Sequence, residues 1–328
     1  MRQSVSLILS SLAVFKSLGR SSNIALVISL GLVIFVFSLM SEYFFSARNL
    51  TNVLGQSSII MLIALGVAIG LIAGEVDISV GSVVAVTAIP LIEIMNSTGS
   101  LPLGILGALA VGMCVGAING YFSVYLKINS LIVTLGMLFI LRGAVYLYTG
   151  KRATPDTVYL ESFFILGNGK LFGVLPIPAL VAGLIAVALI FGMQHLRFGR
   201  RIYAVGGNAE VARLAGYNVM QIKFICFIIC SALATCGGIL LSSRLGAAIH
   251  TAGINYEFQA VAAVVLGGVS LAGGVGTLTG VVLGVLILAF VSNGLGMINA
   301  PTEWQLVITG LVIIAAVTLD SFKSHQRT

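Results

Sequence analysis

Runs of about 20 mostly apolar residues recur along the chain from Ile24 to the C-terminal region. A helix of about that length crosses the hydrocarbon core of a bilayer. The runs are unbroken, whereas an outer-membrane barrel would show alternating strands of about ten residues. Of the 328 residues, 59% are hydrophobic and 8% are charged, which leaves too few charges to cover a water-facing surface. The sequence therefore predicts an all-α, polytopic integral membrane protein.

Hydropathy predicts about ten spans. They lie near residues 24–40, 57–73, 78–96, 102–125, 129–148, 177–194, 222–241, 258–272, 275–296 and 304–320. Most of the 17 basic residues fall on the side that also holds both termini. The positive-inside rule assigns that side to the cytoplasm. We therefore expect cytoplasmic N- and C-termini, and we interpret the net charge of +7 as a topology signal rather than a nucleic-acid-binding patch.

The spans predict a single transmembrane domain over residues 1–328 with two loops of substantial size. Residues 149–176 form the external loop, and residues 195–221 form the cytoplasmic loop. The N-terminus lacks a secretory cleavage pattern, so the first span is expected to be retained. The four cysteines lie inside apolar runs and are interpreted as buried free thiols.

No constellation of residues predicts an enzyme. The three histidines, His195, His250 and His325, lie in different segments, so neither a metal site nor a catalytic triad is expected. The segments 150–154 and 167–172 lack the spacing of a phosphate-binding G-x-x-x-x-G-K-[ST] loop. The sequence therefore predicts no catalytic, cofactor-binding or metal-binding residues in this chain. If the protein's activity is driven by ATP, another subunit must bind and hydrolyse it.

Two glycine-rich segments interrupt the apolar pattern. The first, "GEVDISVGS" (74–82), holds the predicted break residues Gly74, Asp77, Ser79 and Gly81, and the second is "LGGVSLAGGVGTLTG" (266–280). Broken helices in two halves of a chain are typical of transporters. Tight turns between short spans are an equally good interpretation. We favour a role for Asp77 in capping the third span over direct contact with a substrate.

The cytoplasmic loop contains a stretch with the signals of a two-turn helix. Asn208 is a good N-cap, Glu210 suits the positive end of the helix dipole, and Gly216 supplies a C-terminal stop. Arg213 is three residues after Glu210, where the two can interact. Val211, Leu214 and Ala215 share one apolar face. A helix this short is unstable alone in water, so this face is expected to need a partner.

The stretch "FGRRIYAVGGNAEVARLAGYNV" (198–219) resembles the cytoplasmic coupling segment of ribose-type ABC transporter permeases, in the branched-chain amino acid and monosaccharide permease superfamily. The resemblance covers nearly the whole chain. Further matching motifs, in order, are "GEVDISVGS" (74–82), with Glu75 where the family often has Gly, "NSLIVTLGMLFILRG" (129–143), "SRLGAA" (243–248), "YEFQAVAAVVLGGVSLAGGVGT" (256–277) and "SNGLGMI" (292–298).

The resemblance implies an ABC importer permease fold in the bacterial inner membrane and a set of partners. Two ATP-binding cassette subunits would bind ATP and Mg²⁺, a second permease subunit (a copy or a homologue) would complete the pore, and an extracytoplasmic sugar-binding protein would deliver substrate. Membrane lipid surrounds the chain, and no nucleic acid is expected. The two-turn helix would then be the coupling helix, with Asn208 and Gly216 as its caps, Val211 and Leu214 as docking contacts, and Glu210 and Arg213 as polar contacts.

The resemblance also implies a substrate such as a ribose-like pentose, another monosaccharide or a polyol. The candidate pathway residues are Asn119, Asn129, Thr134 and Asn293, although hydrogen bonds between buried helices would explain each equally well. One alternative function is a proton-coupled secondary transporter using Glu75, Asp77 or Glu93. A receptor or scaffold without transport activity is another.

Overall fold

The computed structural model describes residues 23–150 and 160–301 and, beyond them, residues 303–308, 310, 311, 314 and 318. Helices dominate this part of the chain, and the sheet found in it is a two-stranded hairpin. Eight of the described helices are long and apolar enough to cross a membrane. The fold class is therefore confirmed as an all-α, polytopic membrane protein.

The eight long helices match eight predicted spans in order. They are Asn23–Met40, α2 (Ala47–Ile72), α3 (Val80–Thr98), α4 (Leu101–Gly120) continued by the π-helix η1 (Tyr121–Tyr125), α5 (Ser130–Thr149), α7 (Ile177–His195), α10 (Val219–Leu245) and α12 (Leu278–Met297). Both termini and parts of the predicted span 304–320 lie outside the described residues. The total of ten spans and the side of each terminus therefore stay predictions.

The predicted span 258–272 differs from the structure. Helix α11 (Tyr256–Leu266) ends at Leu266 and is shorter than the eight long apolar helices. The chain then leaves the helix through Gly267 and Gly268, and the φ of 83° at Gly268 is a left-handed conformation that glycine adopts without strain. Hydropathy could not place this boundary, because the non-helical residues that follow are also mostly apolar.

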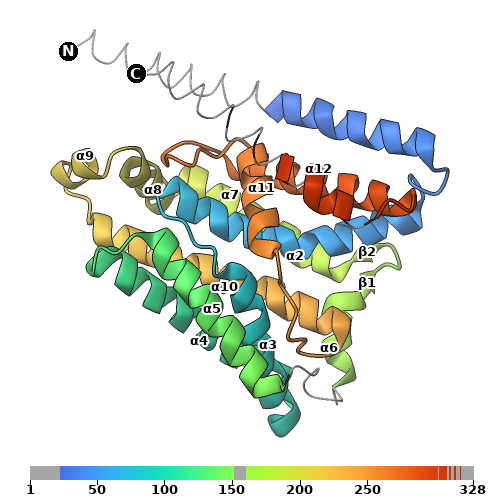
Figure 1. Ribbon diagram of the computed structural model, residues 1–328, viewed down its shortest axis with the longest axis horizontal. Helices are drawn as coiled ribbons and strands as arrows, with labels where there is room; N and C mark the ends of the chain where they lie inside the picture. The colour runs from blue at the N-terminus through green and yellow to red at the C-terminus, as the bar shows by residue number, and fades with distance from the viewer. Residues whose placement is uncertain are drawn as a thin grey trace.

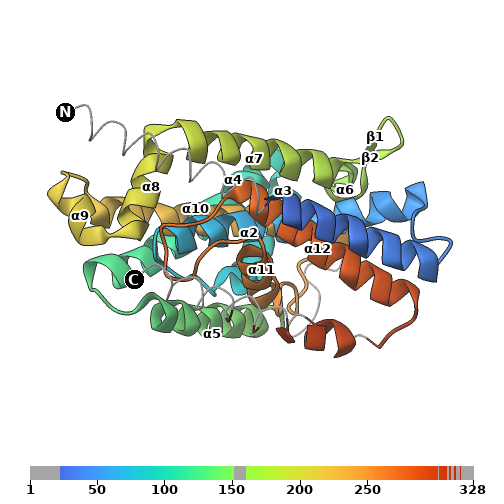
Figure 2. The ribbon, with the colours of Figure 1, turned by 90° about the horizontal axis from the view of Figure 1, so that it is seen from above.

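Helix α2 lies at the centre of the molecule. It contacts α7, α10, α11 and α12, and α10 in turn packs along α3 and α4 (Figures 1 and 2). Of the most apolar stretch of α2, 89% of the residues are buried, against 6% for Asn23–Met40. The first helix therefore lies at the periphery and α2 forms the core.

The two predicted loops contain regular structure at opposite ends of the molecule (Figures 1 and 2). The predicted external loop holds α6 (Glu161–Asn168) and a hairpin of β1 (Lys170–Leu171) and β2 (Leu175–Pro176). The predicted cytoplasmic loop holds α8 (Arg197–Gly207) and α9 (Ala209–Leu214). The long helices run between these ends, so the loops occupy opposite sides of the predicted membrane.

Candidate functional site

Helix α9 is closed at both ends by hydrogen bonds that its sequence predicts. The Asn208 side-chain oxygen accepts from the backbone N–H groups of Glu210 and Val211, both at 3.0 Å. At the other end Gly216 has a φ of 85°, its N–H donates to Arg213 O, and the Tyr217 N–H donates to Ala212 O. This pair of bonds is a Schellman motif. The predicted caps are confirmed, and they hold a helix that is too short to persist alone.

The side chains of α9 divide between the protein and its surroundings. Ala212 is 3% exposed and anchors the helix to the rest of the chain, whereas Val211 is 60% exposed and Leu214 79% exposed. Glu210 and Arg213 are also exposed. The helix therefore presents two apolar side chains beside two opposite charges, an arrangement suited to contact with another protein. The coupling role of these residues stays a prediction.

Helix α8 precedes α9 and was not anticipated from the sequence. Its buried side consists of Gly199, Ile202 and Val205, and its other side carries exposed arginines. The Tyr203 hydroxyl donates to Gly276 O at 2.9 Å, within the second glycine-rich segment. Burial raises the pKa of Tyr203 to about 12, which keeps this hydroxyl protonated as a donor well into the alkaline range.

Three backbone segments meet at the end of α8 through glycines, at what we call the glycine junction (Ile72–Gly74, Gly206–Gly207 and Gly273–Gly274). The Gly274 N–H donates to Ile72 O at 2.9 Å. A Cβ on Gly206 would lie 1.7 Å from Ile72 O, and one on Gly274 would lie 2.4 Å from Gly207 Cα. Only glycine permits such an approach. The junction therefore joins both predicted breaks to the segment that carries α9.

The first break, residues 73–79, is not helical. Gly74 turns the chain with a φ of 79°, and Lys223 Nζ of α10 lies 2.7 Å from Glu75 Oε1 in an ion pair. Asp77 is buried, and its Oδ1 accepts from the Ser79 N–H at 2.9 Å and the Ser79 hydroxyl at 2.6 Å. These bonds fix the chain just before α3, whose N-cap is Ser79 with no side-chain capping bond, so the expected capping role of Asp77 stays a prediction. Gly81 lies within the first turn of α3.

The structure separates the four candidate pathway residues. Asn119 donates to Ser79 Oγ at 2.9 Å, and the Thr134 hydroxyl accepts from the Ile78 N–H at 3.3 Å, so both stabilise the first break. Asn129 is the N-cap of α5. Asn293 is the only one of the four that lines a described cavity. All four make the local or interhelical hydrogen bonds that were the alternative interpretation, because Asn293 of α12 also bonds to Asn49 of α2.

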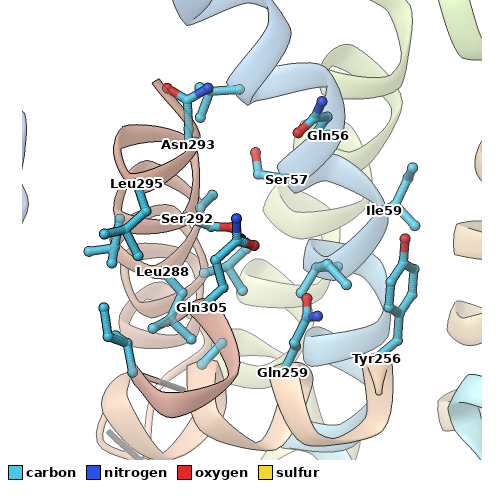
Figure 3. Close-up of a pocket in the computed structure, with 18 of the residues that line it drawn as sticks. Gln56, Ser57, Ile59, Tyr256, Gln259, Leu288, Ser292, Asn293, Leu295 and Gln305 are labelled. Carbon is cyan, nitrogen blue, oxygen red and sulfur yellow. Dashed lines mark hydrogen bonds between the residues drawn. The ribbon is translucent and has the colours of Figure 1, made fainter. Parts of the chain in front are cut away.

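A cavity of about 760 Å³ lies between α2, α11, α12 and residues 303–308 (Figure 3). Its wall is mainly aliphatic, and the side chains of Gln56, Ser57, Gln259 and Gln305 point into it from three sides (Figure 3). The Ser292 hydroxyl donates to Gln305 Oε1 at 2.8 Å. This volume and the mixture of apolar wall with few amides and hydroxyls are typical of a site for a small molecule.

A second cavity of about 560 Å³ adjoins the first on the side of the hairpin. Arg244 and Met297 line both cavities, and the Arg244 guanidinium donates to Asn52 Oδ1 at 3.1 Å. Asn49 and Asn293 form two reciprocal amide hydrogen bonds, of 2.8 and 3.0 Å, beside both. Together the cavities extend from the hairpin end toward the middle of the helices.

Apart from Asn293, the polar residues of the larger cavity were not predicted from the sequence. Gln56, Ser57, Gln259 and Ser292 each lie in an apolar helix, so their polarity was the available signal. Polarity alone did not show whether these side chains line a cavity or bond to another helix. The outcome depends on which helices become neighbours in the fold. Among the described residues no three His, Cys, Asp or Glu side chains come together as a metal site.

Comparison with known proteins gives these features a family context. A model of the family described as branched-chain amino acid transport system / permease component matches residues 49–317. The ribose import permease protein RbsC of Escherichia coli (strain K12) is 37% identical over 90% of this chain and 92% of that protein. The L-arabinose ABC transporter permease protein AraH of Azospirillum brasilense is 36% identical over 88% of this chain and 85% of that protein.

The xylose transport system permease protein XylH of Haemophilus influenzae (strain ATCC 51907 / DSM 11121 / KW20 / Rd) is 32% identical over 90% of this chain and 95% of that protein. No solved structure matches the chain. The family match extends across both predicted breaks, the α8–α9 segment and the cavity helices.

Proposed function

Because the chain belongs to the family of branched-chain amino acid transport system permease components, we propose that it is the membrane subunit of an ATP-driven importer for a small sugar. The observation that carries the proposal is its similarity, over about nine-tenths of its length, to permeases named for ribose and xylose import. It is a multi-pass protein of the cytoplasmic membrane. Its substrate is a ribose-like pentose, a related monosaccharide or a polyol.

The larger cavity supports a neutral, hydroxyl-rich substrate. The amides of Gln56 and Gln259 and the Ser57 hydroxyl both donate and accept hydrogen bonds, as sugar hydroxyls do. The Gln259 side chain has no hydrogen-bond partner among the described residues, so its amide is available to a ligand.

The α8–α9 segment supports an energy source in a partner. In this proposal, an ATP-binding cassette subunit, which binds ATP and Mg²⁺, docks on the exposed side chains of Val211 and Leu214. A displacement of α9 reaches both breaks through the glycine junction, and it reaches the cavities through α10, which runs from Val219 to Leu245 and carries Arg244. A second permease subunit and an extracytoplasmic sugar-binding protein on the hairpin side complete the proposed importer.

The proposal is tested by uptake into proteoliposomes that contain the permease, its ATPase and its binding protein. Labelled ribose, arabinose, xylose and polyols are offered separately, with ATP supplied on the side of the ATPase. We expect uptake of at least one of these solutes that stops when the ATP site of the ATPase is disabled. Uptake that instead collapses with a protonophore and persists without ATP would establish the proton-coupled alternative.

Gln259→Leu is expected to reduce uptake at low substrate concentration by about tenfold. A hydrogen bond from a buried amide to a substrate hydroxyl contributes about 1–1.5 kcal/mol, and leucine fills similar volume without that bond. The measurement is the concentration dependence of ATP-driven uptake. Gln194→Leu, at an exposed position on α7 outside both cavities, is the matched control and should transport normally. Equal uptake by both variants would place the substrate elsewhere.

A further inference from the structure

An exposed apolar stripe runs along α7. Leu184, Val187 and Phe191 are 64%, 66% and 56% exposed, and their spacing places them on one face of the helix. Helix α7 is one of the eight long apolar helices. In a membrane this face therefore contacts the acyl chains of lipids.

Cationic groups lie where the stripe ends. The Phe191 ring stacks on the His195 ring with centroids 4.6 Å apart. The Arg200 guanidinium donates from Nη1 to His195 O at 3.0 Å, which holds this charge at the last turn of α7. Leu196, between α7 and α8, is also exposed. An acyl chain lying on the stripe would therefore place its headgroup within reach of Arg200.

Helix α8 turns across the end of α7 (Figure 2). Its sequence supplies further arginines at this place. Arg197, Arg200 and Arg201 share one helix face through their spacing, and all three are exposed. The Arg201 guanidinium already makes a cation–π contact, because it lies 5.9 Å from the centre of the Tyr217 ring. The ion pair found in the described part of the chain is Lys223–Glu75, so no described carboxylate neutralises these arginines.

We propose that Arg197 and Arg200 bind the phosphate headgroup of an anionic phospholipid whose acyl chains lie on the Leu184–Phe191 stripe of α7. A guanidinium forms two parallel hydrogen bonds to a phosphate, which a point charge does not. Juxtamembrane arginines attract the anionic lipids of the cytoplasmic leaflet. The bound lipid holds α8 against the membrane surface, next to the glycine junction and α9.

The experiment measures lipid binding by the purified full-length permease. Native mass spectrometry compares phosphatidylglycerol with phosphatidylcholine, and thermal unfolding is followed with each lipid and with inorganic phosphate. We expect the wild type to retain phosphatidylglycerol preferentially and to be stabilised by it but not by phosphate. Each of Arg197→Gln and Arg200→Gln should weaken that preference about fivefold. Lys127→Gln removes an exposed charge from the α4–α5 connection, away from the stripe, and is the charge-matched control.

Five outcomes overturn the proposal. Equal stabilisation by inorganic phosphate would indicate a free-anion site rather than a lipid site. An unchanged lipid preference in both arginine variants, or an equal loss in Lys127→Gln, would place the headgroup elsewhere. Loss of ATPase association with unchanged lipid preference would assign the arginines to that partner. The wild-type lipid measurement decides the question even if a variant fails to fold, because absence of any preference refutes the site.

Discussion

Gly206→Ala is expected to destabilise the permease severely and to abolish transport. The new methyl group would lie 1.7 Å from Ile72 O and 2.8 Å from Gly274 N. Both obstacles are backbone atoms, so no side chain can rotate away to make room. The end of α8 must separate from both breaks, at a cost of about 3 kcal/mol or more. Thermal unfolding of the purified protein should show a midpoint lower by at least about 5 °C.

The neighbouring glycine provides the control for this prediction. A Cβ on Gly207 has no atom within 4 Å, and the residue is the last of α8. Gly207→Ala should therefore be neutral or slightly stabilising, because alanine restricts the unfolded chain. Two adjacent and chemically identical substitutions are thus expected to differ in effect. If both variants unfold at the wild-type temperature, the glycine junction does not hold the segments together.

Leu214→Asp is expected to release the ATPase while the permease still inserts in the membrane. Leu214 is 79% exposed, so the substitution removes little contact within the chain. In the proposed complex the side chain is buried, and a central apolar contact of this kind contributes about 2 kcal/mol or more. Affinity should therefore fall at least about thirtyfold. The measurement is the amount of ATPase that co-purifies with the permease, together with ATP-driven uptake.

Phe172→Asp is the matched control, because it also replaces an exposed apolar side chain with a carboxylate. Phe172 is 92% exposed at the tip of the β1–β2 hairpin, at the opposite end of the molecule (Figure 1). Its substitution should leave ATPase association unchanged. Normal association and uptake in Leu214→Asp would exclude α9 as the docking element, and equal losses in both variants would indicate a general effect of surface charge.

The sequence predicted the features that depend on local chemistry. The apolar runs indicated the long helices, and Asn208 and Gly216 indicated both ends of α9, because caps act within a few residues. Hydropathy does not distinguish an apolar residue that faces lipid from one that packs against protein. It therefore extended the span of α11 past Leu266 and gave no sign that α2 is buried and Asn23–Met40 is not.

The parts of the site that depend on distant contacts were not predictable. Gly74, Gly206 and Gly274 are far apart in the sequence, and nothing local indicates that their backbones touch. The pathway prediction selected amides and hydroxyls without knowing their neighbours. It therefore grouped Asn293, which lines a cavity, with Asn119 and Thr134, which hold the first break.

The difference in burial between α2 and Asn23–Met40 has a consequence for how the chain tolerates sequence drift. A bilayer accepts almost any apolar side chain, whereas a close-packed interior accepts few shapes. Most of Asn23–Met40 is exposed at the surface of the described chain, and its packed face is a narrow one through Leu30, Ile34 and Phe37. We therefore expect the exposed positions of Asn23–Met40 to tolerate exchange among leucine, isoleucine, valine and phenylalanine. Most substitutions in α2 should instead disturb its packing.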